Sequence, residues 1–108
     1  MKYEVRIDNI ASEDLYAIYR YVAVNDSPSK AENLLDNIQK AMTSLEIIPA
    51  RGSFPPELQR WGIADFREIF FKPYRIIYEM RSKTVFIHAV LDGRRNCEDL
   101  LQQRLLGT

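Results

Sequence analysis

Four arginines in the second half of the chain are the residues best suited to chemistry. Arg67 and Arg75 lie eight positions apart across a short link, which places them on neighbouring strands, and Arg94 and Arg95 follow directly after a third β-like segment. A guanidinium group is a planar fork of donors that matches a phosphate or a carboxylate. These side chains therefore predict a site that binds an anion or an acidic target.

The same arginines have acidic neighbours that offer a different interpretation. Glu68 and Glu79 lie close enough in sequence to pair with Arg67 and Arg75 across the strands. Exposed cross-strand ion pairs contribute little stability each. The spacing alone leaves the anion site and the ion pairs equally open.

Most other chemistries lack the residues that they need. The chain has one His and one Cys, which form no metal-ligand cluster, and its four glycines are too scattered for a phosphate-binding loop. We therefore expect no metal and no cofactor. His88 could carry protons near neutral pH, but its place within a β-like segment favours a packed strand residue over a general base.

The charges are balanced overall but divided unequally along the chain. The 15 basic and 15 acidic side chains give a net charge of zero, with five basic and eight acidic residues in 1–50 and ten and seven in 51–108. A basic region can attract an acidic partner. It falls short of the broadly basic surface of a protein that holds nucleic acid mainly through phosphates.

Hydrophobic periodicity predicts the elements that position these residues. Alternating apolar residues predict strands over 2–7, 66–71, 74–80 and 84–91. Apolar spacings of three and four residues predict two helices, one ending at Asn25 and Asp26 and one running from Ser27 and Pro28 to a stop at Pro49. Residues 50–64 read as a loop, and residues 95–106 as a short terminal helix.

Together these elements predict a single α+β domain over residues 1–108. Short links require antiparallel neighbours, and the first strand must join the same sheet to satisfy its backbone. The helix hairpin is expected to cover one face and leave the other open to solvent or a partner. The lone Cys97, the lack of a signal-peptide pattern and the lack of a membrane-spanning stretch predict a cytoplasmic protein.

Six short segments carry a family resemblance. They are DLYAIYRYVA (14–23), the PxxG of 49–52, PEL (56–58), RE (67–68), YRIIYE (74–79) and VLDGRRNCEDLL (90–101). In this order they resemble the RelE/ParE family of toxins from bacterial type II toxin–antitoxin modules, nearly end to end. The resemblance implies a small α+β fold, a protein that arrests growth, a cognate antitoxin that neutralises it, and DNA contact only through that antitoxin.

The two halves of that family differ in their target. RelE-like members cleave messenger RNA on the ribosome with basic residues and a tyrosine, whereas ParE-like members act on DNA gyrase. The sequence keeps the RelE-like arginine at Arg75 and one after the last strand. It has Arg67 and Ile69 where a lysine pair is expected, and Leu100 or Leu101 where the tyrosine is expected.

The chemistry agrees with this departure from the RelE-like pattern. RNA cleavage needs groups that take and return a proton, and arginine hardly deprotonates. We therefore favour a ParE-like, non-enzymatic toxin that acts on DNA gyrase. The alternative is a RelE-like ribosome-dependent mRNA endoribonuclease, and a third interpretation is an interaction module with no toxic target. In the nuclease the catalytic residues would be Arg67, Arg75, His88, Arg94 and Arg95.

Apolar residues beyond the needs of a small core predict where the antitoxin binds. We expect these residues to be exposed and to line an apolar groove that the antitoxin fills. The alternative for the leucines is that they cap the sheet. The residues are Tyr16, Tyr19, Trp61, Leu100 and Leu101.

Overall fold

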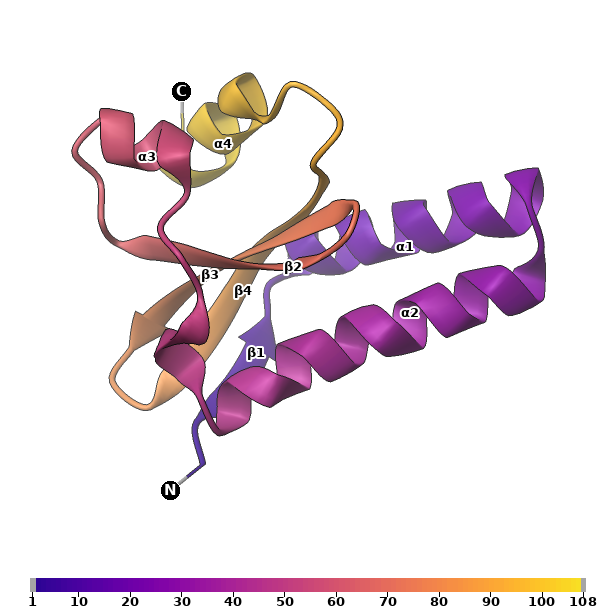
Figure 1. Cartoon of the computed structure of the whole chain (residues 1–108), viewed down its shortest axis with the longest axis horizontal. Helices are drawn as coiled ribbons and strands as arrows, with labels where there is room; N and C mark the ends of the chain where they lie inside the picture. The colour runs from indigo at the N-terminus through magenta and orange to yellow at the C-terminus, as the bar shows by residue number, and fades with distance from the viewer. Residues whose placement is uncertain (1, 108) are drawn as a thin grey trace.

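The computed structural model describes residues 2–107 and has an α+β architecture, which confirms the predicted fold class (Figure 1). Its second helix ends earlier than predicted because the chain tightens into two 3-10 turns before and at Pro49, and a short third helix interrupts the predicted loop. In chain order the elements are β1 (Glu4–Ile7), α1 (Asn9–Asn25), α2 (Pro28–Thr43), η1 (Ser44–Glu46), η2 (Pro49–Arg51), α3 (Pro56–Arg60), β2 (Phe66–Phe71), β3 (Tyr74–Arg81), β4 (Thr84–Asp92) and α4 (Cys97–Leu106).

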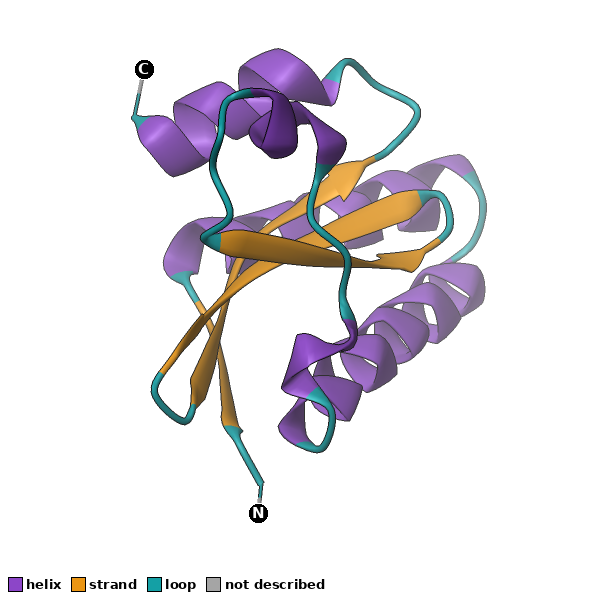
Figure 2. Ribbon diagram, turned by 60° about the vertical axis from the view of Figure 1, so that its left-hand side comes forward, coloured by secondary structure: helices purple, strands orange, loops and turns teal. Residues whose placement is uncertain are grey.

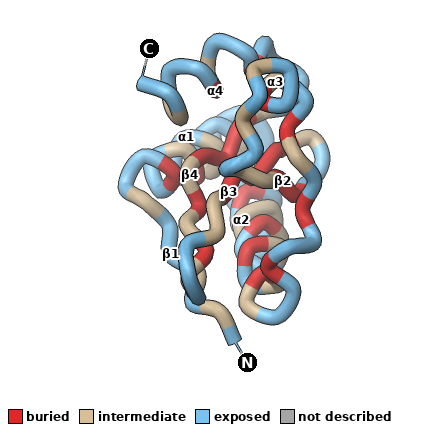
Figure 3. Tube along the Cα trace, turned by 90° about the vertical axis from the view of Figure 1, so that its left-hand side faces the viewer, coloured by how far each residue is buried: buried red, intermediate tan, exposed pale blue. Residues whose placement is uncertain are grey.

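The four strands form one mixed sheet in the order β1-β4-β3-β2. The three later strands form an antiparallel meander through short links, as predicted. The first strand joins this sheet, also as predicted, and it runs parallel to β4 with Val5 opposite Val85. Buried residues gather on the central strands, while the outer surfaces of the helices are exposed (Figure 3).

Side-chain caps start both helices of the hairpin. The Asp8 carboxylate accepts the Ala11 N–H at 2.8 Å, and the Ser27 hydroxyl accepts the Lys30 N–H at 3.2 Å. Each cap satisfies an amide that has no partner within the helix. Pro28 occupies the first turn of α2, where no helical hydrogen bond is lost.

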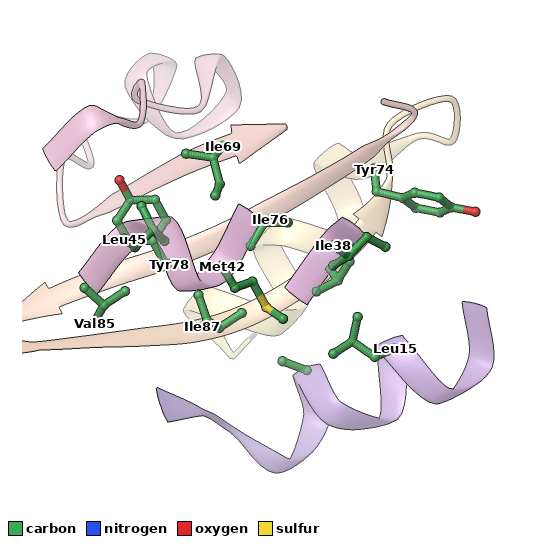
Figure 4. Packing of buried hydrophobic residues seen from close by; sticks show 12 residues of the cluster. Leu15, Ile38, Met42, Leu45, Ile69, Tyr74, Ile76, Tyr78, Val85 and Ile87 are labelled. Carbon is green, nitrogen blue, oxygen red and sulfur yellow. The ribbon is translucent and has the colours of Figure 1, made fainter. Parts of the chain in front are cut away.

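The main core lies between the helix hairpin and one face of the sheet (Figure 4). Leu15 of α1 and Ile38 and Met42 of α2 pack there against Ile76 of β3 and Ile87 of β4. Full burial of one such side chain contributes about 1.5–3 kcal/mol. This layer fixes the position of α1 relative to the ends of β3 and β4.

The opposite face of the sheet is partly covered by α4, so the expectation that it would be open is wrong there. Ile77 and Leu91 of the sheet pack against Cys97 and Leu101 of α4. Leu101 is fully buried, which corrects the expectation that it is exposed, because α4 turns its leucines onto the sheet. In Figure 2, α3 and α4 lie together on the side of the strands away from the hairpin.

The last helix is tied to the first through Arg104. Its two terminal nitrogens donate to the two carboxylate oxygens of Asp14 at 3.1 and 2.8 Å, and one of them also donates to the carbonyl of His88 at 3.0 Å. Asp14 in turn accepts the Val90 N–H at 3.0 Å. This network joins α1, β4 and α4.

The strand β4 contains a bulge at His88. Ile77 pairs with Ala89 and Tyr78 pairs with Ile87, so His88 has no opposite residue on β3. The extra residue changes which face the following side chains reach.

None of the helices in residues 2–107 combines the length and the apolar character that crossing a membrane requires.

Candidate functional site

Arg75 is already paired within its own chain. Its side chain is 10% exposed; Nε donates to Glu68 at 2.7 Å, and the two terminal nitrogens donate to the two carboxylate oxygens of Glu57 at 2.7 and 2.8 Å. The hydrogen bonds with Glu57 are the main reason that the pKa of Arg75 is raised and that of Glu57 is lowered. Arg75 therefore holds two carboxylates in the place where an external anion would bind.

Arg67 of β2 links the sheet to the segment 50–54. Its terminal nitrogen donates to the carbonyl oxygens of Ala50 and Gly52 at 3.3 and 2.9 Å, and its guanidinium lies 4.5 Å from the centre of the Phe54 ring. The predicted ion-pair interpretation therefore holds for Arg75 with Glu68 and does not describe Arg67.

His88 lies between two carboxylates. Its Nδ1 is 3.0 Å from Asp8 and its Nε2 is 2.9 Å from Glu79, which also pairs with Arg81 at 2.9 Å. Burial works to raise the pKa of Glu79, but the hydrogen bonds from Arg81 and His88 outweigh it and leave this pKa lowered. Glu79 is four residues along β3 from Arg75, about 13 Å at the rise of a strand, so His88 and Arg75 do not meet in one site.

Arg94 and Arg95 lie at an open pocket of about 410 Å³, which we call the Arg95 pocket. Arg94 folds back onto Asp92, with Nε and Nη2 at 3.0 and 2.9 Å from its two oxygens, and these bonds lower the pKa of Asp92. Arg95 forms no ion pair with any residue in 2–107. The other walls come from α1 and the start of β3, and they are Ala17, Ile18, Tyr21 and Tyr74.

A second hollow of about 380 Å³, which we call the α1–α2 groove, lies between the helices of the hairpin. It brings together Tyr16, which is 64% exposed, and Tyr19, and no charged side chain lines it. Trp61 directly follows α3 and Leu100 lies in α4. Both are half-buried, and neither lines this groove. The remaining walls are Ile7, Ser12, Leu15, Leu35 and Gln39.

The structure thus separates the predicted site residues into several places. Arg94 and Arg95 share one pocket, Tyr16 and Tyr19 share the α1–α2 groove, and the other predicted site residues line neither. Within residues 2–107 no group of three or more His, Cys, Asp or Glu side chains is arranged to hold a metal ion. Sequence reasoning missed the tyrosines of the Arg95 pocket. One available signal was that Tyr21 lies outside the apolar stripe of its helix and so had to be exposed.

The mixed four-stranded sheet, the helix hairpin and the short terminal helix define the RelE/ParE-like class of small α+β folds. The family model described as the ParE toxin of type II toxin-antitoxin systems, parDE, matches residues 5–97. The chain therefore belongs to the ParE toxin family of type II toxin–antitoxin systems, which confirms the family predicted from the sequence.

Solved structures agree on the fold. The chromosomal ParDE TA system from P. aeruginosa is 18% identical with a TM-score of 0.71, and the match covers 82% of this chain and 94% of that one. A mutant of the E. coli toxin RelE in the free state is 14% identical with a TM-score of 0.66, covering 99% and 98% of the two chains. At these identities the likeness concerns the fold alone. No curated protein matches this sequence.

Proposed function

We propose that this ParE-type toxin arrests growth by binding DNA gyrase in the cytoplasm, without cleaving RNA. The proposal treats residues 1–108 as one toxin domain. It extends the family assignment, and its support comes from how the charged side chains of the sheet are already engaged with one another.

The observation that carries the proposal is the separation of the groups a nuclease would combine. Arg75 holds Glu57 and Glu68, whereas His88 lies between Asp8 and Glu79. Glu79 is four residues from Arg75 on β3, about 13 Å along the strand. A proton carrier must reach the atom that it serves within about 3 Å. With the arginine occupied and the imidazole distant, this surface favours binding over RNA cleavage.

The alternative is a RelE-like, ribosome-dependent mRNA endoribonuclease. The observation in its favour is the position of His88 on the face away from the helix hairpin, beside the aromatic rings of Phe66 and Phe86. Such rings could stack with bases. In this alternative His88 would move protons, and its replacement would abolish activity.

The cognate antitoxin is proposed to occupy the α1–α2 groove. The groove is uncharged, offers Tyr16 and Tyr19, and suits the apolar side of a helix or an extended segment. Replacing Tyr16 by Ala removes an exposed ring and is expected to weaken antitoxin binding about tenfold or more. The matched control is Tyr21→Ala, a similarly exposed tyrosine of α1 that is absent from the groove.

Expression in cells tests the proposal. The chain is produced with and without the neighbouring reading frame that encodes the antitoxin, while viability, the SOS response and ribosome-bound transcripts are recorded. We expect growth arrest with an SOS response and intact transcripts, relieved by the antitoxin. Transcripts cut at codon-spaced positions would support the nuclease, and unaffected growth would support the interaction module.

A further inference from the structure

The Arg95 pocket and the α1–α2 groove lie on opposite sides of one helix. Ala17 and Tyr21 of α1 line the pocket, whereas Tyr16 and Tyr19 line the groove. At about 100° per residue, the two pairs point about 150° apart around the helix axis. The two sites therefore face different sides of α1.

The pocket has no free carboxylate that would repel an anion. The one carboxylate on its wall, Asp92, already binds Arg94 through both oxygens. The Tyr74 hydroxyl has no hydrogen-bond partner among residues 2–107. Because every buried side-chain nitrogen or oxygen in those residues does have a partner, this hydroxyl is exposed to solvent at the pocket. Figure 4 shows the Tyr74 ring reaching away from the other core residues with its hydroxyl at the tip.

Two further donors stand at the pocket. Tyr21 is 67% exposed, and Arg95 is a cation without an ion-pair partner among the described residues. The floor between them is apolar, from Ala17, Ile18 and the tyrosine rings. A ligand that matches this lining carries a negative group next to an apolar or aromatic body.

The charge at the pocket distinguishes a protein ligand from a nucleic acid. Arg94 is neutralised by Asp92, which leaves one unpaired cation at the pocket. Phosphate-backbone binding takes its affinity from several cations acting together, whereas a single arginine flanked by tyrosines suits a carboxylate in an apolar setting.

From this arrangement we infer that the Arg95 pocket receives an acidic segment of the toxin's protein target, with a side-chain carboxylate bound by Arg95 and the hydroxyls of Tyr21 and Tyr74. The inference rests on the proposed function for the statement that the target is a protein. It adds where that target docks.

The first experiment measures binding to the full chain by calorimetry. The probe is an acetylated, amidated acidic hexapeptide with one phenylalanine, and the control peptide carries amides in place of its carboxylates. We expect Arg95→Gln to weaken acidic-peptide binding about tenfold or more, and Tyr21→Phe to weaken it less, because a charge-assisted hydrogen bond is stronger than a neutral one. Arg6→Gln removes an exposed arginine far from the pocket and should change nothing.

Two results of this titration would overturn the inference. Equal binding of the acidic and amide peptides would show that no carboxylate is recognised. Tighter binding of a 12-nucleotide oligo(dT), lost in Arg95→Gln, would assign the pocket to nucleic acid.

A gyrase supercoiling assay with the same variants separates this inference from the proposed function. Weaker inhibition by Arg95→Gln, at unchanged antitoxin affinity, is expected. Inhibition by Arg95→Gln equal to that of the unaltered chain would refute the docking site and keep the gyrase target. Binding of the acidic peptide through Arg95 without any effect of the toxin on gyrase would refute the target and keep the site.

Discussion

Removing Arg75 should destabilise the fold far more than the loss of a surface ion pair. Glu68 is 2% exposed, and its carboxylate bonds to Arg75 at 2.7 Å. In Arg75→Met this carboxylate stays buried without a partner, which costs about 3–5 kcal/mol. A domain of this kind has about 5–15 kcal/mol of stability in total, so the loss is a large part of it.

Urea unfolding followed by the fluorescence of Trp61, the single tryptophan, measures this loss. With a slope of about 1.5 kcal/mol per molar urea, the midpoint should fall by about 2–3 M. The double variant Arg75→Met with Glu68→Met removes the buried carboxylate together with its partner and should recover part of that fall. The recovery is partial because Glu57 also loses Arg75. A drop below about 0.5 M for the single variant, or a double variant less stable than it, would refute the reasoning.

Three further predictions concern other contacts of the same framework. Because the pKa of Glu57 lies below its ordinary value of 4.5, its contribution to stability is complete above that pH and is lost as the pH falls through the lowered pKa. Glu57→Gln should therefore flatten the acid side of the stability profile measured by urea unfolding. Gly52→Ala places a methyl group 2.5 Å from the Tyr78 hydroxyl and should cost about 1–3 kcal/mol of unfolding free energy in the same assay, whereas an unchanged value would contradict the packing described here. Arg104→Gln removes the link between α4 and Asp14 and should speed amide hydrogen exchange in α4 while leaving the α1–α2 hairpin protected; equal exchange in both proteins would contradict the link.

Local patterns predicted most of the secondary structure. The period-two segments became β1 to β4, and the cap at Ser27 began the second long helix at the expected place. These features depend on residues that are close in sequence, so a pattern within a short window contains them. The parallel pairing of β1 with β4 joins residues some 80 positions apart, and no local pattern encodes its direction.

The partners of the charged residues were less predictable for the same reason. Glu57 reaches Arg75 across 18 positions that include the whole of β2, so sequence proximity pointed instead to Glu68 and Glu79. The bulge at His88 shifts the alternation of side chains between the two faces of the sheet along β4, and no residue type near it indicates this shift. The face of the sheet that α4 covers depended on packing, because its leucines would suit either a groove or a cap.

The most direct test of the central claim uses the purified chain in two reactions at once. One measures supercoiling by DNA gyrase, and the other maps the ends of messenger RNA on translating ribosomes. The account predicts loss of supercoiling, reversed by the antitoxin, with intact transcripts. Cleaved transcripts with normal gyrase activity, and loss of that cleavage in His88→Gln, would contradict it.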